Sequence, residues 1–148
     1  MLARDIMTLE PAVVTATDTV PVAAQLMRTR DVGMLPVVDD LVHRRLVGVL
    51  TDRDIVLRYV APEHGRLASV RDHMTREPMV TATATSTIAE VVARMSRHQV
   101  RRLPVVDAND AVIGVIAQAD IALKVRPHDA DLVDHLTEAI SRPGALVH

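Results

Sequence analysis

The chain is an internal duplication, and no other feature of the sequence limits its fold so strongly. Residues 3–8 (ARDIMT) return as residues 70–75 (VRDHMT), and residues 35–39 (LPVVD) return as residues 103–107 (LPVVD). The offset between matching positions stays between 66 and 68 residues. Such small drifts, placed where loops are expected, are typical of a duplicated domain. Two copies of one fold are therefore predicted.

Each copy is predicted to run strand, helix, strand, strand, helix, an α+β (α/β-like) fold. In the second copy Thr87 and Glu90 form a helix capping box. Apolar residues then recur at helical spacing, i, i+3, i+4 and i+7: Ile88, Val91, Val92 and Met95, matched in the first copy by Val20, Ala23, Ala24 and Met27. A strand opened by proline follows, at Pro36 and Pro104, and then a glycine-bearing strand and a closing helix.

The organisation expected from this pattern is a first copy at 1–60, a linker at 61–69, a second copy at 70–125 and a helical tail at 126–148. In the tail, Asp129 is a plausible helix cap and residues 142–144 (RPG) a stop signal. The apolar stripe between them consists of Leu132, Val133, Leu136 and Ile140. This stripe either docks on the rest of the chain or packs across a dimer interface.

Residues 48–55 (GVLTDRDI) predict a strand that runs directly into a helix. Such a junction points free backbone N–H groups outward and suits a phosphate. The Thr51 hydroxyl can donate to that phosphate, and the Asp54 carboxylate can accept from a sugar diol. The alternative is a structural one, because Thr-x-x-Asp is also close to a helix capping box.

The tandem pattern DIMT, LPVVD and GVLTDRDI resembles a pair of CBS domains, a Bateman module, over about residues 1–125. The resemblance implies that the two copies pack about a pseudo-twofold axis as one disc with two clefts. It also implies that each cleft can hold an adenosine nucleotide, with AMP, ADP and ATP as candidate regulatory ligands and no resident cofactor. Modules of this kind usually form dimers through their helices, so a homodimer is expected.

The resemblance also assigns residues to the two clefts. The first would use Thr51 for phosphate and Asp54 for the ribose, flanked by Met74, Met79, Val80 and Val100. Arg53, Arg101 and Arg102 are candidate phosphate contacts there, the alternative being solvated arginines or pairs with Asp107 and Asp110. The second would use Asp120, with Met7, Ala12, Val32 and Met34.

The second cleft departs from the family pattern. Ala117 stands where Thr51 does, and Ala119 where Arg53 does. A lost hydrogen bond to a charged group costs about 1.5–3 kcal/mol. The second cleft is therefore expected to bind more weakly than the first.

Composition excludes several classes of function. The chain has no cysteine and a net charge of −2, and it contains no apolar run of membrane-spanning length. These features argue against thiolate chemistry, nucleic-acid binding and a membrane span, and they suit the cytoplasm. No catalytic motif and no metal-ligand spacing is evident, so neither an enzyme nor a metal site is expected.

Two functional hypotheses follow. The first is a regulatory sensor of an adenine nucleotide, acting on a protein partner that the sequence does not name. The second is a ligand-independent scaffold of the stress-response type, whose clefts are filled by Met34, Met74 and Met79, because methionine fills irregular gaps. Arg44-Arg45 and Arg101-Arg102 give only a weak case for DNA binding.

Overall fold

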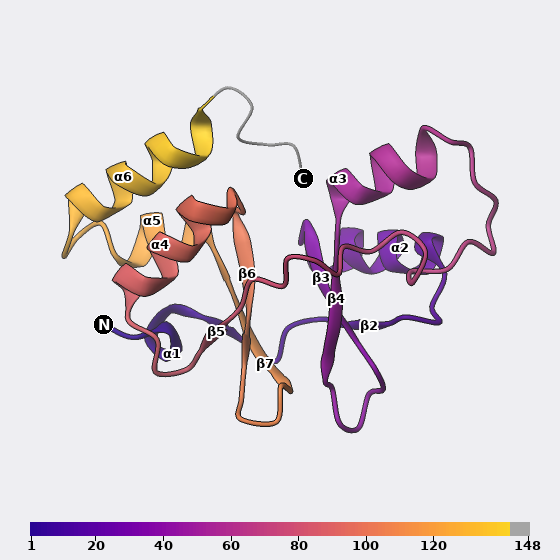
Figure 1. The fold of residues 1–148 in the computed structure, drawn as a ribbon, viewed down its shortest axis with the longest axis horizontal. Coiled ribbons are helices and arrows are strands. Elements are labelled where there is room, and N and C mark those ends of the chain that lie inside the picture. The colour runs from indigo at the N-terminus through magenta and orange to yellow at the C-terminus, as the bar shows by residue number, and fades with distance from the viewer. Residues whose placement is uncertain (143–148) are drawn as a thin grey trace. The chain divides into compact units, whose positions relative to one another are not determined.

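The computed structural model describes residues 1–142 and combines helices with two β-sheets (Figure 1). The helices are α1 (Ala3–Ile6), α2 (Val20–Arg30), α3 (Asp52–Asp54), the π-helix η1 (Ile55–Val60), α4 (Ile88–His98), α5 (Gln118–Lys124) and α6 (Ala130–Ser141). The strands are β1 (Thr8–Leu9), β2 (Val14–Thr15), β3 (Met34–Val38), β4 (Leu46–Thr51), β5 (Ala82–Thr83), β6 (Arg102–Val106) and β7 (Val112–Ala117). The predicted α+β class is confirmed.

The chain separates into two compact units whose boundaries cross the repeats. The first-repeat unit holds Pro11–Met79 and Ala108–Val112, and the second-repeat unit holds Met1–Glu10, Val80–Asp107 and the chain from Ile113 on. The opening segment of each sequence repeat therefore belongs to the unit built from the other repeat. Periodicity alone does not predict this exchange.

In the first-repeat unit the sheet order is β2-β3-β4, with β2 parallel and β4 antiparallel to β3. Helix α2 is capped by Thr19, whose side chain accepts from the Val22 N–H at 3.4 Å. The predicted stripe on α2 is buried at Val20, Ala23 and Met27, in one core with sheet residues Leu35, Val37 and Leu50. The first strand of this unit, β2, is only two residues long, Val14–Thr15.

In the second-repeat unit the sheet order is β1-β7-β6-β5, and the N-terminal strand β1 lies antiparallel to β7. The capping box at the start of α4 is present: Thr87 N–H donates to Glu90 Oε2 at 2.9 Å, and Glu90 N–H donates to Thr87 Oγ1 at 3.2 Å. The predicted stripe on α4 is buried with residues of β6, β7 and α5. The sequence predicted this helix, its cap and its buried face.

The tail helix α6 docks on the chain's own second-repeat unit, beside α4 and α5 (Figure 1). Asp129 caps it by accepting from the Leu132 N–H at 3.0 Å. Val133, Leu136 and Ile140 are at most 1% exposed within the same core. Of the two alternatives for the apolar stripe, intramolecular docking is the one observed. Pro143 and Gly144, expected to stop the helix, lie outside the described residues.

Candidate functional site at the strand–helix junctions

Thr51 and Asp54 form a reciprocal cap where β4 runs into α3. The Thr51 N–H donates to Asp54 Oδ2 at 3.0 Å, and the Asp54 N–H donates to Thr51 Oγ1 at 3.0 Å. The side chain of Asp54 is only 5% exposed. The structural alternative proposed from sequence is therefore present, and it places a buried carboxylate beside a hydroxyl at a helix start.

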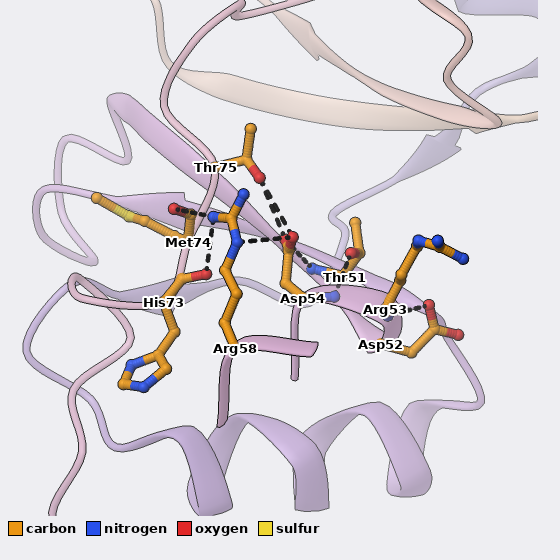
Figure 2. Close-up of polar contacts among 8 residues, drawn as sticks. All are labelled: Thr51, Asp52, Arg53, Asp54, Arg58, His73, Met74 and Thr75. Carbon is orange, nitrogen blue, oxygen red and sulfur yellow. Dashed lines mark hydrogen bonds and ion pairs between the residues drawn. The ribbon is translucent and has the colours of Figure 1, made fainter. Parts of the chain in front are cut away.

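Two further side chains surround the Asp54 carboxylate (Figure 2). Thr75 Oγ1 donates to Asp54 Oδ1 at 3.3 Å and to Oδ2 at 3.4 Å. Arg58 Nε lies 3.9 Å from Oδ1, and the same guanidinium donates to the carbonyls of His73 and Met74 at 3.3 and 3.1 Å. A buried carboxylate needs such partners, because removing its hydration uncompensated is costly.

The two oxygens of Asp54 are not equally occupied. Oδ2 is held by a backbone N–H at 3.0 Å, whereas the partners of Oδ1 lie at 3.3 and 3.9 Å. Hydroxyl groups that donate to a carboxylate usually approach to about 2.5–2.7 Å. Oδ1 therefore has the capacity to accept a shorter bond than the one it receives from Thr75, because Arg58 Nε lies beyond hydrogen-bond distance.

Gly48 allows the segment that carries Met74 and Thr75 to reach this junction. A Cβ atom at Gly48 would lie 2.6 Å from Met74 Sδ and 3.1 Å from the Thr75 carbonyl oxygen. Thr75 and Val49 exchange backbone hydrogen bonds of 2.8 and 2.9 Å across the same place. Only a residue without a side chain permits this approach, which explains the glycine in residues 48–55.

The matching junction around Asp120 has the same frame, by which we mean a backbone N–H that donates to the carboxylate, a cation beside the carboxylate and a glycine covered by a methionine. Ala117 N–H donates to Asp120 Oδ2 at 2.8 Å, and a Cβ at Gly114 would lie 2.7 Å from Met7 Sδ. Lys124 Nζ takes the place of the Arg58 guanidinium, 3.7 Å from Asp120 Oδ1 and donating to the Ile6 carbonyl at 2.8 Å. The side chain of Asp120 is 22% exposed, and Ala117 supplies no hydroxyl.

The arginines expected to meet phosphate have different surroundings. Arg53 and Arg101 are exposed, and Arg102 is half-buried in β6. The Arg101 carbonyl accepts from the Gln118 N–H at 2.8 Å, as the Gly33 carbonyl accepts from the Asp52 N–H at 2.9 Å. The backbone of Arg101 therefore contacts the start of α5 at the Asp120 junction of its own unit, while its side chain is exposed to solvent.

The remaining predicted residues divide between the two units. Met79 belongs to the first-repeat unit with Thr51, Arg53, Asp54 and Met74, and so do three residues predicted for the second cleft: Ala12, Val32 and Met34. The second-repeat unit contains Val80, Val100, Arg101, Arg102, Met7 and Asp120. The structure brings Met74 to Thr51 and Asp54. The meeting of residues from different units in shared clefts stays a prediction.

Sequence reasoning missed two members of this site, Thr75 and Arg58. Thr75 had a signal, since the dipeptide Met-Thr recurs in both copies at residues 7–8 and 74–75. Arg58 stands four residues after Asp54, the spacing of an intrahelical ion pair, as Lys124 does after Asp120. Both signals become readable only once the two copies are compared at the junction.

Residues 1–142 contain neither a cluster of three or more metal-ligating side chains nor a membrane-spanning helix. No group of three or more histidine, aspartate or glutamate residues is arranged to hold a metal ion. No helix in the described part of the chain is long and apolar enough to cross a membrane.

The CBS-domain family model matches residues 3–61 and 70–126, the two copies of the sequence repeat. Hypoxic response protein 1 of Mycobacterium tuberculosis is 35% identical over 144 residues, 97% of this chain and 96% of that protein. The resemblance to CBS domains drawn from the sequence is therefore confirmed. CBS domain-containing protein YhcV of Bacillus subtilis is 38% identical over 120 residues, 81% of this chain and 82% of that protein.

Solved structures agree with these matches. The crystal structure of Hypoxic Response Protein I with two coordinated zinc ions has a TM-score of 0.74 and 36% identity, over 84% of this chain and 98% of that one. The CBS domain pair of protein MJ0100, in complex with 5′-methylthioadenosine and S-adenosyl-L-methionine, has a TM-score of 0.74 and 26% identity, over 87% and 98%. CBSX2 in complex with AMP has a TM-score of 0.69 and 29% identity, over 84% and 98%.

An enzyme is among the matched relatives. Inosine-5′-monophosphate dehydrogenase of Streptococcus pyogenes is 30% identical over 123 residues, which are 82% of this chain but 24% of the enzyme. The similarity therefore concerns about a quarter of the enzyme's length.

Proposed function

We propose that this chain, which belongs to the CBS-domain family and carries two copies of the domain, is a non-catalytic regulatory module that binds an adenosine nucleotide. The observation that carries the proposal is the buried carboxylate of Asp54, whose Oδ1 has only long contacts, at a helix start where the Thr51 hydroxyl accepts from the Asp54 N–H. Relatives of the same fold hold AMP, 5′-methylthioadenosine and S-adenosyl-L-methionine. The proposed ligand belongs to the AMP, ADP and ATP class, and the proposed setting is the cytoplasm.

The proposed binding mode gives each group one task. The ribose hydroxyls donate to Asp54 Oδ1 and replace the long contact from Thr75. The phosphate is bound by the Thr51 hydroxyl and by three arginines, Arg53, Arg101 and Arg102. Charge-assisted hydrogen bonds of this type are stronger than bonds between neutral groups. Met74 and Met79, with Val80 and Val100, flank the base. Ligand binding would then change the geometry of the pair and its affinity for a protein partner.

The test is a thermal-shift series with AMP, ADP, ATP and S-adenosylmethionine on wild type, Asp54→Asn and Asp120→Asn. A ligand at about 100 times its dissociation constant stabilises the folded state by roughly 2.7 kcal/mol. In a chain of this size that is a rise in Tm of roughly 5–10 °C. We expect the rise in wild type and Asp120→Asn, and its loss in Asp54→Asn.

A ligand-independent scaffold is the second candidate, and one observation favours it. The Asp54 carboxylate is partnered by Thr51, Thr75 and Arg58 without any ligand, while Met74 is 7% exposed and packed on Gly48. In this case none of the four test ligands would raise Tm at saturating concentration, and Asp54→Asn would change only the stability of the free chain.

We also propose that the chain forms a homodimer through the helices of the first-repeat unit. Apolar side chains on α2 and η1 are more than half exposed: Val22 at 52%, Val56 at 56%, Leu57 at 51% and Val60 at 56%. In the second-repeat unit the chain's own α6 packs on α4 and α5. A second copy would cover the helices of the first-repeat unit in the way that α6 covers those of the second.

Light scattering coupled to size exclusion tests the dimer with a matched control. We expect wild type to elute with the mass of two chains and Val56→Glu/Val60→Glu with the mass of one. Leu67→Glu is the control, because Leu67 is 90% exposed but lies on the linker segment. A wild type that is monomeric at micromolar concentration would contradict the proposal, and so would a dimer that survives the double substitution.

A further inference from the structure

Two histidines of the first-repeat unit face each other through their ring nitrogens. His73 Nε2 lies 2.7 Å from His64 Nδ1, and the two ring planes stand at 77° with centroids 5.0 Å apart. His73 is 3% exposed, whereas His64 lies on the exposed segment that links the sequence repeats. The Tyr59 ring contacts the His73 ring edge-on at 5.8 Å. Neither imidazole takes part in the nucleotide-binding mode proposed above.

The proton position on His73 follows from its second contact. His73 Nδ1 lies 2.7 Å from the Ser69 carbonyl oxygen, which can only accept. Nδ1 must therefore carry the proton, and in a neutral ring Nε2 then presents its lone pair toward His64. A histidine that donates one ring N–H to a backbone carbonyl and offers the other nitrogen is the arrangement found around bound metal ions.

We propose that His64 Nδ1 and His73 Nε2 bind a divalent transition-metal ion of the kind that prefers imidazole, such as Zn²⁺. In the neutral His64 ring the proton would move from Nδ1 to the solvent-facing Nε2, so that both lone pairs converge on the ion. Zinc–nitrogen bonds of about 2.0–2.1 Å at a tetrahedral angle set the two nitrogens about 3.4 Å apart. The pair has to open by about 0.7 Å, and the exposed linker that carries His64 can supply that movement.

The other coordination positions of the ion would be filled by water. Within residues 1–142 no third histidine, aspartate or glutamate joins this pair in a metal-holding group. His64 lies at the exposed edge, so water has access to the ion. The site is thus an open one with two protein ligands, unlike the closed four-ligand sites of structural zinc.

The proposed metal site is joined to the Asp54 junction by covalent and hydrogen bonds. The His73 carbonyl accepts from Arg58 Nη1, and Arg58 Nε faces Asp54 (Figure 2). The His73 ring points away from the carboxylate, so the two sites occupy different sides of the same segment (Figure 2). A metal ion that fixes His73 would also hold this segment against Gly48 and β4.

Calorimetric titration of the full, tag-free chain with ZnCl₂ after chelator dialysis tests the proposal. We expect a binding step of one Zn²⁺ per chain in wild type, weakened at least tenfold in His64→Ala. His64 is exposed, so its removal leaves the core intact. His43→Ala is the matched control, because His43 is also exposed and its Nδ1 also has a partner, Asp40 at 3.0 Å. The control is expected to bind as wild type does.

Nitrogen-detected NMR of the histidine rings gives an independent readout. Zinc should move the His64 proton from Nδ1 to Nε2 and leave the His73 proton on Nδ1. An absence of stoichiometric zinc binding in wild type would overturn the proposal, as would unchanged affinity in His64→Ala. Zinc binding without a change in the His64 tautomer would also overturn it, because the ion would then be bound elsewhere.

Discussion

Asp54 and Asp120 occupy matching positions, three residues past the last residue of β4 and of β7. Both accept from the backbone N–H of the strand's last residue, at 3.0 and 2.8 Å, and both have a cation four residues on at 3.9 and 3.7 Å. Both junctions also have a glycine that a methionine covers. This shared frame is structural, because each repeat needs it to hold the opening segment of the other sequence repeat.

The differences lie in the hydroxyl groups. The Thr51 side-chain oxygen accepts from the Asp54 N–H in the cap, and Thr75 adds a second hydroxyl, which donates to the Asp54 carboxylate. Ala117 has no hydroxyl, and among the hydrogen bonds of residues 1–142 none joins Thr8, the counterpart of Thr75, to Asp120. The Asp54 side chain is correspondingly less exposed, at 5% against 22%. The comparison separates what the fold requires at both junctions from what the first junction adds.

The largest effect should come from removing each carboxylate. Asp54→Ala leaves the Thr51 N–H, the Thr75 hydroxyl and Arg58 without their acceptor, and hydrogen bonds to charged groups are worth about 1.5–3 kcal/mol each, not additively. We expect a loss of about 3 kcal/mol in the free energy of unfolding. Asp120→Ala removes one backbone bond and one exposed ion pair, and should cost about 1 kcal/mol.

Urea denaturation of the two variants measures this difference directly. If both substitutions cost the same, the extra partners of Asp54 contribute nothing to stability and the two junctions are equivalent. That result would remove the structural basis for distinguishing them. Asp54→Asn keeps the shape of the side chain, and comparing it with Asp54→Ala separates the loss of charge from the loss of packing.

The shared frame predicts equal effects at the two glycines. A Cβ at Gly48 or Gly114 would lie 2.6 or 2.7 Å from a methionine sulfur and 3.1 Å from a backbone carbonyl in both cases. The sulfur can move aside, but the carbonyl belongs to a hydrogen-bonded segment. We therefore expect Gly48→Val and Gly114→Val each to cost about 2 kcal/mol by overpacking. Chemical denaturation midpoints that differ strongly between the two would show that the frame is not shared.

The sequence predicted features that depend on neighbours along the chain. The helix starts after Thr87 and Asp129 were predicted from capping residues, and the buried faces of α2, α4 and α6 were predicted from apolar spacing. The Thr51–Asp54 cap was likewise foreseen as an alternative. Each of these depends on residues three or four positions apart, where local sequence determines the contact.

Contacts between segments far apart in the chain could not be predicted from local spacing. Strand β1 pairs with β7, more than one hundred residues later, and Thr75 reaches Asp54 from beyond the linker. Periodicity contains no information on such pairings, and only the resemblance to CBS domains brought Met74 toward Thr51 and Asp54. The π-helical hydrogen bonding of η1 was also missed, because apolar residues at 55, 56 and 59 suit an α-helix equally well.

The smallest expected effect gives the sharpest test, because it converts one junction toward the other. Ala117→Thr restores the missing hydroxyl at a residue whose backbone is already extended, with φ −107° and ψ 157° against −106° and 160° at Thr51. The new hydroxyl can accept from the Asp120 N–H as Thr51 accepts from the Asp54 N–H. We expect a gain of about 1 kcal/mol in unfolding free energy, and Thr51→Ala should lose a similar amount.

The same pair of variants addresses ligand binding. If the Thr hydroxyl distinguishes the clefts, Ala117→Thr should add a second nucleotide-binding step in calorimetry and Thr51→Ala should weaken the first roughly tenfold or more. A stability gain without a second step would show that the hydroxyl serves the helix cap alone. In that case the first junction would owe its affinity to the Thr75 contact and to Arg58. The second junction has a threonine, Thr8, at the position of Thr75 but a lysine at the position of Arg58, so Arg58→Lys and Lys124→Arg become the next exchange.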